Sequence, residues 1–266
     1  MCAPIQLTAG AVSSHRCQQC AQPVHFDDRY PLNLAGMRKL RNQHIYAEAP
    51  LRGLQDAQLR VLLPDLQRCA GNHALLVTTT GGKSPPALPL LACWTELRVD
   101  GIHYSGDLDA AADEPLPFID DAFDVVWLRH ALEVVPQPAA VLQETVRVLA
   151  PGGTLVIAGV HPFSAWAPWF YWTTRGAGSE LHAPLQLMHD LRRAGLDVVS
   201  TRRVGHLWPL AGKYGPRGRV PWGGGYVLLA RKQRCLVTPL RVVHTAPLRM
   251  PASSRLSPSA RHGTTA

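Results

Sequence analysis

The chain alternates between short apolar runs, which predict buried strands, and segments whose apolar side chains recur at helical spacing. Predicted helices cover Leu51 to Cys69, Pro86 to Trp94, Pro138 to Leu149 and Leu185 to Ala194. Predicted strands cover Ala74 to Val77, Glu96 to Asp100, Phe123 to Leu128, Thr154 to Ala158, Asp197 to Arg203 and Gly225 to Arg231. Strands that alternate with helices over short connections indicate an α/β domain around a mostly parallel sheet.

This pattern divides the chain into three regions. Residues 1–36 show neither period and are expected to form a loose N-terminal extension, and the alternative start Met37 opens the patterned chain. Residues 37–236 hold all the predicted helices and strands. Residues 237–266 are rich in Pro, Ser and Arg without a period, so we expect a basic, disordered tail.

Doubly wound sheets bind their ligands at the carboxyl ends of parallel strands. The candidate site therefore lies where the predicted strands end, at Val77, Asp100, Leu128 and Ala158. A carboxylate at Asp100 can accept hydrogen bonds from two neighbouring ribose hydroxyls, as in nucleotide-binding sheets. Asp is also a common turn former, so both interpretations of Asp100 stay open.

A series of motifs in the middle of the chain has a specific order and spacing. It comprises Gly106-Asp107, Leu116-Pro117-Phe118, Asp120 to Val126, Ala131-Leu132-Glu133, and Glu144 to Leu155 with its Pro151-Gly152-Gly153 turn. This series resembles the class I S-adenosylmethionine-dependent methyltransferases, in the branch called type 11. The resemblance covers about residues 70 to 235.

The resemblance implies a Rossmann-like, doubly wound, mostly parallel sheet with an antiparallel last strand. It also implies S-adenosyl-L-methionine as cofactor and methyl transfer to an acceptor, for which a small molecule ranks first. The implied cofactor-binding positions are Thr79, Thr80, Gly81 and Gly82 for the methionine part, Asp100 for the ribose, Asp107, Leu108 and Asp109 for the adenine, and Leu128 and Arg129 for the sulfonium side.

Two features depart from the family's pattern. Its first motif is normally an acid followed by G-x-G-x-G, whereas Thr78 to Lys83 supply two glycines and no acid. The β-branched threonines resist the positive φ that glycine permits. The link from Asp100 to Gly106 is also too short for the usual helix between the second and third strands. A methyltransferase-like binding or regulatory module without catalytic activity is therefore the alternative interpretation.

Two histidines follow predicted strand ends and are candidates for a catalytic base. His130 comes directly after Leu128 and Arg129, and His161 follows the strand that ends at Ala158. Imidazole titrates near neutral pH, which suits the removal of a proton from an acceptor. The alternative for each is a polar loop histidine without a chemical role.

Six aromatic side chains lie within the ten residues from Phe163 to Trp172. We interpret this segment as a Trp-rich loop that either shapes a pocket for a bulky apolar acceptor or contacts a membrane interface. A cap over the end of the sheet is the alternative interpretation.

The formal charge of +8 is unevenly distributed. Residues 1–180 hold 13 Lys and Arg against 17 Asp and Glu, a net charge of −4. Residues 181–266 hold 14 Lys and Arg against 2 Asp and Glu, a net charge of +12. The positive charge is thus separate from the predicted cofactor contacts, so RNA or DNA as acceptor or partner ranks after a small molecule.

Composition and the N-terminal sequence bear on cellular location and on metal binding. Six scattered Cys do not make a disulfide scaffold, and residues 1–14 lack the pattern of a signal peptide. Val148 to Thr174 lack charge, but their prolines and glycines break a membrane span. We therefore expect a cytoplasmic protein without a transmembrane helix. Cys17-x-x-Cys20 is at most half of a zinc site, so no metal is expected, and the oligomeric state stays open.

Overall fold

The structure is a computed structural model, and it describes residues 45–79, 84–100, 103–111, 114–174, 178–209 and 222–233. The chain divides into two compact units, residues 1–234 and 235–266, and every described residue belongs to the first unit. The expected N-terminal extension 1–36 and the expected tail 237–266 lie outside the described residues.

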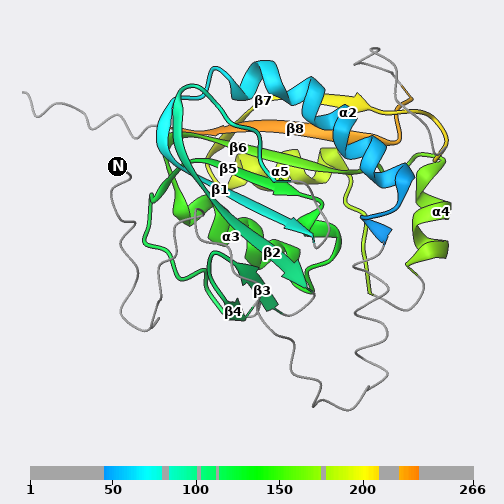
Figure 1. Cartoon of the computed structure of the whole chain (residues 1–266), viewed down its shortest axis with the longest axis horizontal. Coiled ribbons are helices and arrows are strands. Elements are labelled where there is room, and N and C mark those ends of the chain that lie inside the picture. The colour runs from blue at the N-terminus through cyan, green and yellow to red at the C-terminus, as the bar shows by residue number, and fades with distance from the viewer. Residues whose placement is uncertain are drawn as a thin grey trace, which may run out of the picture. The chain divides into compact units, whose positions relative to one another are not determined.

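The strands of the described residues form one sheet in the order β4-β3-β2-β1-β5-β6-β8-β7 (Figure 1). They are β1 (Gly71–Thr79), β2 (Leu91–Asp100), β3 (His103–Gly106), β4 (Ala110–Ala111), β5 (Phe123–Arg129), β6 (Leu149–Val160), β7 (Leu196–Val204) and β8 (Gly225–Lys232). The central strands β2, β1, β5 and β6 are parallel, and β8 is antiparallel to both β6 and β7. The predicted mostly parallel sheet with an antiparallel last strand is confirmed.

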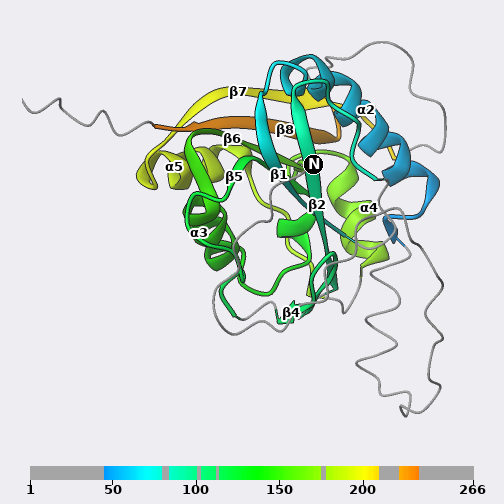
Figure 2. The same cartoon turned by 60° about the vertical axis from the view of Figure 1, so that its left-hand side comes forward.

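Helices cover both faces of the sheet (Figure 2). One face carries α2 (Ala49–Leu66) and α4 (Trp166–Thr173), and the other carries α3 (Pro138–Val148) and α5 (Pro184–Arg193). Alternate residues of a strand point to opposite faces. In β1, Leu75 and Val77 therefore join the core with α3 and α5, whereas Ala74 and Leu76 join the core with α2 and α4. This two-sided burial is the doubly wound arrangement, and it explains the unbroken apolar runs within the central strands, such as Ala74 to Val77 and Leu155 to Ala158.

Three predicted helices are confirmed with shifted ends. Helix α2 runs through Pro64 and ends at Leu66. Helix α3 ends at Val148, ahead of the predicted stop at Pro151, because β6 already begins at Leu149. Helix α5 is closed by Gly195 as expected, since this glycine adopts a left-handed φ of 83°.

The predicted helix from Pro86 to Trp94 is wrong. Residues 84–90 contain no helix, and β2 begins at Leu91. The prolines of this segment lack the N–H donors that a helix needs, and the residues from Leu91 onward pair with β1 instead. Trp94 packs there against Trp127 of β5, with the two ring centroids 6.3 Å apart.

The prediction of a loop for the Trp-rich segment is also wrong, because its residues from Trp166 onward form helix α4. Pro168 stands in the first turn, where the helix needs no N–H donor. Trp166 and Phe170, one turn apart, are buried, while Trp172 stays exposed. One side of this aromatic segment therefore caps the sheet, and the other side faces solvent.

The edge of the sheet beyond β2 is a hairpin of short strands. Asp100 is opposite His103 and Leu97 is opposite Gly106, so β3 runs back along β2 in the antiparallel direction. The short link between Asp100 and His103 leaves room for a turn but for no crossover helix. This reversal is the structural consequence of the short link noted in the sequence, and it decides where the residues after Gly106 lie.

Candidate active site at the carboxyl edge of the sheet

The carboxyl ends of the four parallel strands lie next to one another. Thr79 of β1 is opposite Val99 of β2, Thr78 is opposite Arg129 of β5, and Arg129 is opposite Ala158 of β6. We call this side of the sheet, where β1, β2, β5 and β6 end, the carboxyl edge. The sequence-predicted site residues that lie on or directly after these strand ends are Thr79, Asp100, Leu128, Arg129, His130 and His161.

The two threonines that end β1 point to opposite faces and differ in their hydrogen bonding. Thr78 Oγ1 accepts a hydrogen bond of 3.0 Å from Arg129 Nε. Thr79 Oγ1 is buried and has no hydrogen-bond partner among the described residues. A buried hydroxyl without a hydrogen-bond partner costs free energy, unless a ligand supplies the partner. Thr80, Gly81 and Gly82, predicted to contact the cofactor, lie outside the described residues.

Arg129 brings a fixed positive charge to the end of β5. Its side chain is buried, and the guanidinium carbon lies 5.3 Å from the centroid of the Trp127 ring. Burial lowers the pKa of Arg129 to about 10, against the opposing effect of the Glu96 carboxylate. The guanidinium therefore stays charged at neutral pH. Leu128 points to the opposite face and packs in the core beneath α3.

Asp107 does not join Asp100 at the carboxyl edge. Asp107 Oδ2 accepts a hydrogen bond of 2.8 Å from Glu96 N, and Asp107 N donates one of 3.0 Å to Glu96 O. Glu96 stands four residues before the end of β2, a distance of about 13 Å along a strand. The adenine-binding roles of Asp107, Leu108 and Asp109 stay predictions, and the reversed hairpin places Asp107 away from the strand ends.

A buried polar network joins the carboxyl edge to the segment around α2. Glu133 Oε2 accepts a hydrogen bond of 2.7 Å from Tyr46 Oη and lies 3.1 Å from His130 Nδ1. His130 Nε2 lies 3.0 Å from Gln58 Oε1, and Gln58 Nε2 donates to Gly159 O at 3.0 Å. Burial, reinforced by the charge of Glu133, raises the pKa of Tyr46, so the Tyr46 hydroxyl stays protonated and donates.

This network occupies both ring nitrogens of His130, the first candidate base. Both ring nitrogens of His130 face oxygen acceptors of the network, and the side chain is fully buried. Neither nitrogen is directed at solvent. Sequence reasoning missed the roles of Tyr46 and Gln58 because neither belongs to a motif, and it named Glu133 only as part of the family series. The catalytic role of His130 stays a prediction.

His161 is held differently, just past the end of β6. Its Nδ1 accepts a hydrogen bond of 3.1 Å from Phe163 N, which leaves the proton of the neutral ring on Nε2. Burial, followed by the positive charge of Arg203, lowers the pKa of His161 to about 4. The imidazole is therefore neutral at neutral pH. To accept a proton, Nδ1 must first lose its hydrogen bond from Phe163 N. The role of His161 as a base also stays a prediction.

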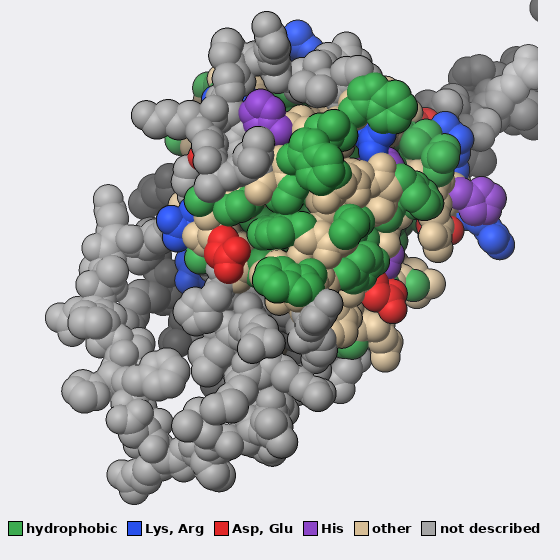
Figure 3. Space-filling view, turned by 90° about the vertical axis from the view of Figure 1, so that its right-hand side faces the viewer, with side chains coloured by type: hydrophobic (Ala, Val, Ile, Leu, Met, Phe, Trp, Pro, Cys, Tyr) green, Lys and Arg blue, Asp and Glu red, His purple; other side chains and the backbone are tan. Residues whose placement is uncertain are grey.

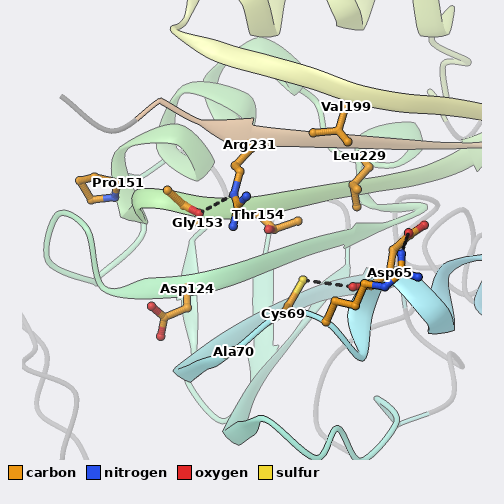
Figure 4. Close-up of a pocket in the computed structure, with 12 residues that line it drawn as sticks. Asp65, Cys69, Ala70, Asp124, Pro151, Gly153, Thr154, Val199, Leu229 and Arg231 are labelled. Atoms are coloured by element: carbon orange, nitrogen blue, oxygen red, sulfur yellow. Dashed lines mark hydrogen bonds and ion pairs between the residues drawn. The ribbon is translucent and has the colours of Figure 1, made fainter. Parts of the chain in front are cut away.

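A hollow of about 440 Å³ lies at the opposite edge of the sheet, where the parallel strands begin (Figure 4). Asp124, Thr154 and Arg231 are among the residues that line it. Its charged groups already have partners: Arg231 Nε donates to Gly152 O at 3.0 Å, and Asp124 Oδ2 accepts from Asn72 N at 2.8 Å. Because it lies where the strands begin, the hollow is separate from the carboxyl edge, where they end.

The described residues offer neither a metal-binding cluster nor a membrane-spanning helix. Within the described ranges, no group of three or more His, Cys, Asp or Glu side chains is placed to hold a metal ion. Cys17 and Cys20 lie outside those ranges. Among the helices that the structure describes, none is long and apolar enough to cross a membrane.

Comparisons with known proteins bear directly on the carboxyl edge. Residues 92–157 match the type 11 family described as "Methyltransferase domain". "Methyltransferase GfsG" of Streptomyces halstedii is 36% identical over 64 residues, which are 24% of this chain and 23% of that protein. "Probable phthiotriol/phenolphthiotriol dimycocerosates methyltransferase 2" of Mycobacterium ulcerans is 34% identical over 100 residues, which are 37% of this chain and 39% of that protein. The chain thus matches less than half the length of these curated relatives.

The resemblance to class I S-adenosylmethionine-dependent methyltransferases is confirmed for residues 92–157, which run from β2 into β6 and contain Asp100, Leu128 and Arg129. Among solved structures, this chain is similar to a SAM-dependent methyltransferase of Thermotoga maritima, described as a possible histamine N-methyltransferase. That similarity has 17% identity and a TM-score of 0.49, and it covers 75% of this chain and 99% of the other.

Proposed function

We propose that the chain is an S-adenosylmethionine-dependent methyltransferase that acts on a bulky apolar small molecule. The observation that carries the proposal is the methyltransferase match over residues 92–157, because the matched segment covers β5 and most of β2 and β6, three of the four strands that end at the carboxyl edge. The match covers the predicted ribose-binding Asp100 and the predicted sulfonium-side residues Leu128 and Arg129.

Two side chains at the carboxyl edge fit the cofactor. Thr79 Oγ1 is a buried oxygen that lacks a hydrogen-bond partner among the described residues, so it can bond the polar methionine end. Asp100 ends β2, where its two carboxylate oxygens can accept both ribose hydroxyls. The bound cofactor supplies an already activated methyl group. The chain's own task is then to hold the acceptor in line with that group and to exclude water.

The surface beside the carboxyl edge supports an apolar acceptor. Helix α4 follows β6, which ends at the carboxyl edge, and the Tyr171 and Trp172 side chains of α4 are exposed. Aromatic rings of this kind bind apolar molecules through large contact areas. His161 stands between β6 and α4, where it is the better placed of the two candidate bases because its ring is only half-buried.

Calorimetric titration with S-adenosylmethionine and S-adenosylhomocysteine tests the cofactor assignment. We expect Asp100→Asn to weaken binding tenfold or more, because a hydrogen bond to a charged group contributes about 1.5–3 kcal/mol. Asp190→Asn, at an exposed position of α5, is the matched control and should bind as the unaltered protein does. Absence of binding at millimolar concentrations of both compounds would overturn the proposal.

A methyltransferase-like module that does not bind the cofactor is the second candidate. The reversal of β3 favours it, because Asp107 bonds the backbone of Glu96 instead of lying at the carboxyl edge. Under this candidate, neither S-adenosylmethionine nor its product binds, although the chain folds. Asp109→Asn separates the candidates further: an affinity loss would place the segment after β3 at the cofactor and reject the module.

A further inference from the structure

Six large hydrophobic side chains are exposed on the described surface near α4. We call them the aromatic patch: Phe163, Tyr171, Trp172, Leu207, Trp208 and Trp222. Their exposed fractions run from 46% for Tyr171 and Leu207 to 80% for Phe163. Trp side chains are rarely left this open on a protein that contacts only water, so a concentration of three exposed Trp residues indicates a contact surface.

The patch is built by segments that are hydrogen-bonded to one another. Arg203 Nη2 donates to Phe163 O at 3.0 Å, and Trp166 Nε1 donates to His206 O at 2.8 Å. His161 N donates to Gly224 O at 2.8 Å, which ties in the segment that carries Trp222. The side of the molecule on which α4 lies shows hydrophobic side chains gathered together, with charged groups at the margin of the gathering (Figure 3).

Positive charge lies among the segments of the patch, and charged side chains of both signs lie at its margin (Figure 3). The segments that form it, residues 161–174, 203–209 and 222–225, contain no Asp or Glu, and Arg203 lies among them. In the sequence, the link from Trp208 to Trp222 also holds Lys213, Arg217 and Arg219 and no acid, and these three bases lie outside the described residues. Glu180 is the nearest acid along the chain beyond α4, and its neighbour Leu181 donates to the Tyr171 hydroxyl at 3.4 Å.

The position of the patch relates it to the candidate active site. Val160 of β6 is opposite Gly225 of β8, and Gly225 is opposite Val204 of β7. The segments that carry the patch therefore leave the sheet at the carboxyl edge, the same side on which β1, β2 and β5 end.

We propose that the aromatic patch docks the protein on the surface of a lipid bilayer that contains anionic lipids. Trp and Tyr rings have an apolar body and a polar end, which suits the boundary between headgroups and acyl chains. Arg203 among the patch segments, and the three bases in the sequence that links Trp208 to Trp222, add electrostatic attraction to anionic headgroups. Docking in this orientation would turn the carboxyl edge toward the lipid, so an apolar acceptor could enter from the bilayer; only this consequence rests on the proposed function.

A vesicle sedimentation assay with the full chain tests the proposal. The probes are vesicles of phosphatidylcholine alone and of phosphatidylcholine with phosphatidylglycerol. We expect binding to the anionic vesicles, a blue shift of tryptophan emission, and weaker binding as salt rises. The patch variant Phe163→Ser, Trp172→Ser, Trp208→Ser should lower the bound fraction tenfold or more, and circular dichroism confirms that it still folds.

A matched variant controls for the general loss of exposed apolar surface. Leu90, Leu185 and Val199 are also exposed but lie outside the patch, so Leu90→Ser, Leu185→Ser, Val199→Ser should bind anionic vesicles as the unaltered chain does. Equal binding by the patch variant and the control would overturn the proposal and leave the basic sequence alone as the cause. Absence of vesicle binding would also overturn it, as would patch-dependent binding to RNA or patch-dependent self-association without lipid. None of these results depends on cofactor binding.

Discussion

The imidazole of His130 lies 3.1 Å from the carboxylate of Glu133, and both side chains are excluded from solvent. Tyr46 and Gln58 complete the network from the segment before α2 and from α2 itself. His130 has a φ of 57°, a left-handed conformation that costs a non-glycine residue about 1–2 kcal/mol. The network thus offsets a local strain at the end of β5 and ties α2 to the carboxyl edge.

Tyr46→Phe tests the contribution of this network to stability. The substitution removes the hydroxyl that donates to Glu133 Oε2 at 2.7 Å and leaves a buried carboxylate with one donor fewer. We expect the free energy of unfolding to fall by about 1–3 kcal/mol, as measured by chemical denaturation. Tyr171→Phe, whose ring is partly exposed, should change it by less than about 0.5 kcal/mol. In a Glu133→Gln background, the effect of Tyr46→Phe should shrink, and an unchanged effect would contradict a direct coupling.

The neighbouring threonines of β1 should respond in opposite ways to the same substitution. Thr78→Val removes the acceptor of the buried Arg129 Nε, so we expect a loss of about 1–3 kcal/mol in the free energy of unfolding. Thr79→Val removes a buried hydroxyl that has no partner among the described residues, so stability without ligand should stay the same or rise by about 1 kcal/mol. The same Thr79→Val variant should bind S-adenosylmethionine more weakly. Equal destabilisation by both variants, measured by thermal unfolding, would speak against this assignment.

His161 should make stability depend on pH in the acidic range. Its pKa in the folded protein is about 4, below the ordinary 6.5, because of burial and the charge of Arg203. Between pH 6.5 and 4 the unfolded chain binds a proton that the folded chain does not, so this contribution to stability is lost as the pH falls through that window. Arg203→Gln should raise the pKa of His161 in an NMR titration, whereas Arg193→Gln, at the exposed end of α5, should not. A His161 pKa near 6.5 in the unaltered protein would refute the prediction.

Gly159→Ala should disturb the same buried network from β6. A Cβ at Gly159 would stand 2.9 Å from Glu133 Oε1 and 2.9 Å from Tyr226 Oη, and both of these side chains are buried. We expect overpacking to lower the free energy of unfolding by about 1–3 kcal/mol. Gly178→Ala is the comparison, because no atom lies within 4 Å of its added Cβ and only its φ of 71° opposes the change. A smaller loss at Gly159 than at Gly178 would show that the network yields easily.

Several elements could be predicted because their signals are local. The apolar runs at Phe123 to Leu128 and Thr154 to Ala158 are strands β5 and β6, and the stripe from Pro138 to Leu149 is helix α3. The segment from Pro86 to Trp94 could not be predicted correctly, since its apolar residues suit either period and pairing with β1 selected the strand. The Trp-rich helix α4 was missed because Pro168 is a helix breaker everywhere except in the first turn.

The sequence by itself determined the class of sheet, the methyltransferase resemblance and the arrival of Thr79, Asp100 and Arg129 at one edge, because strand ends in a parallel sheet share a side. The sequence showed that the link after Asp100 is too short for a helix, but only the tertiary structure showed that β3 pairs antiparallel with β2 and that Asp107 bonds Glu96, away from that edge. It also decided which buried polar groups meet. Tyr46 and Glu133 are 87 positions apart in the sequence, and their contact depends on how α2 packs on the sheet, which no local pattern encodes.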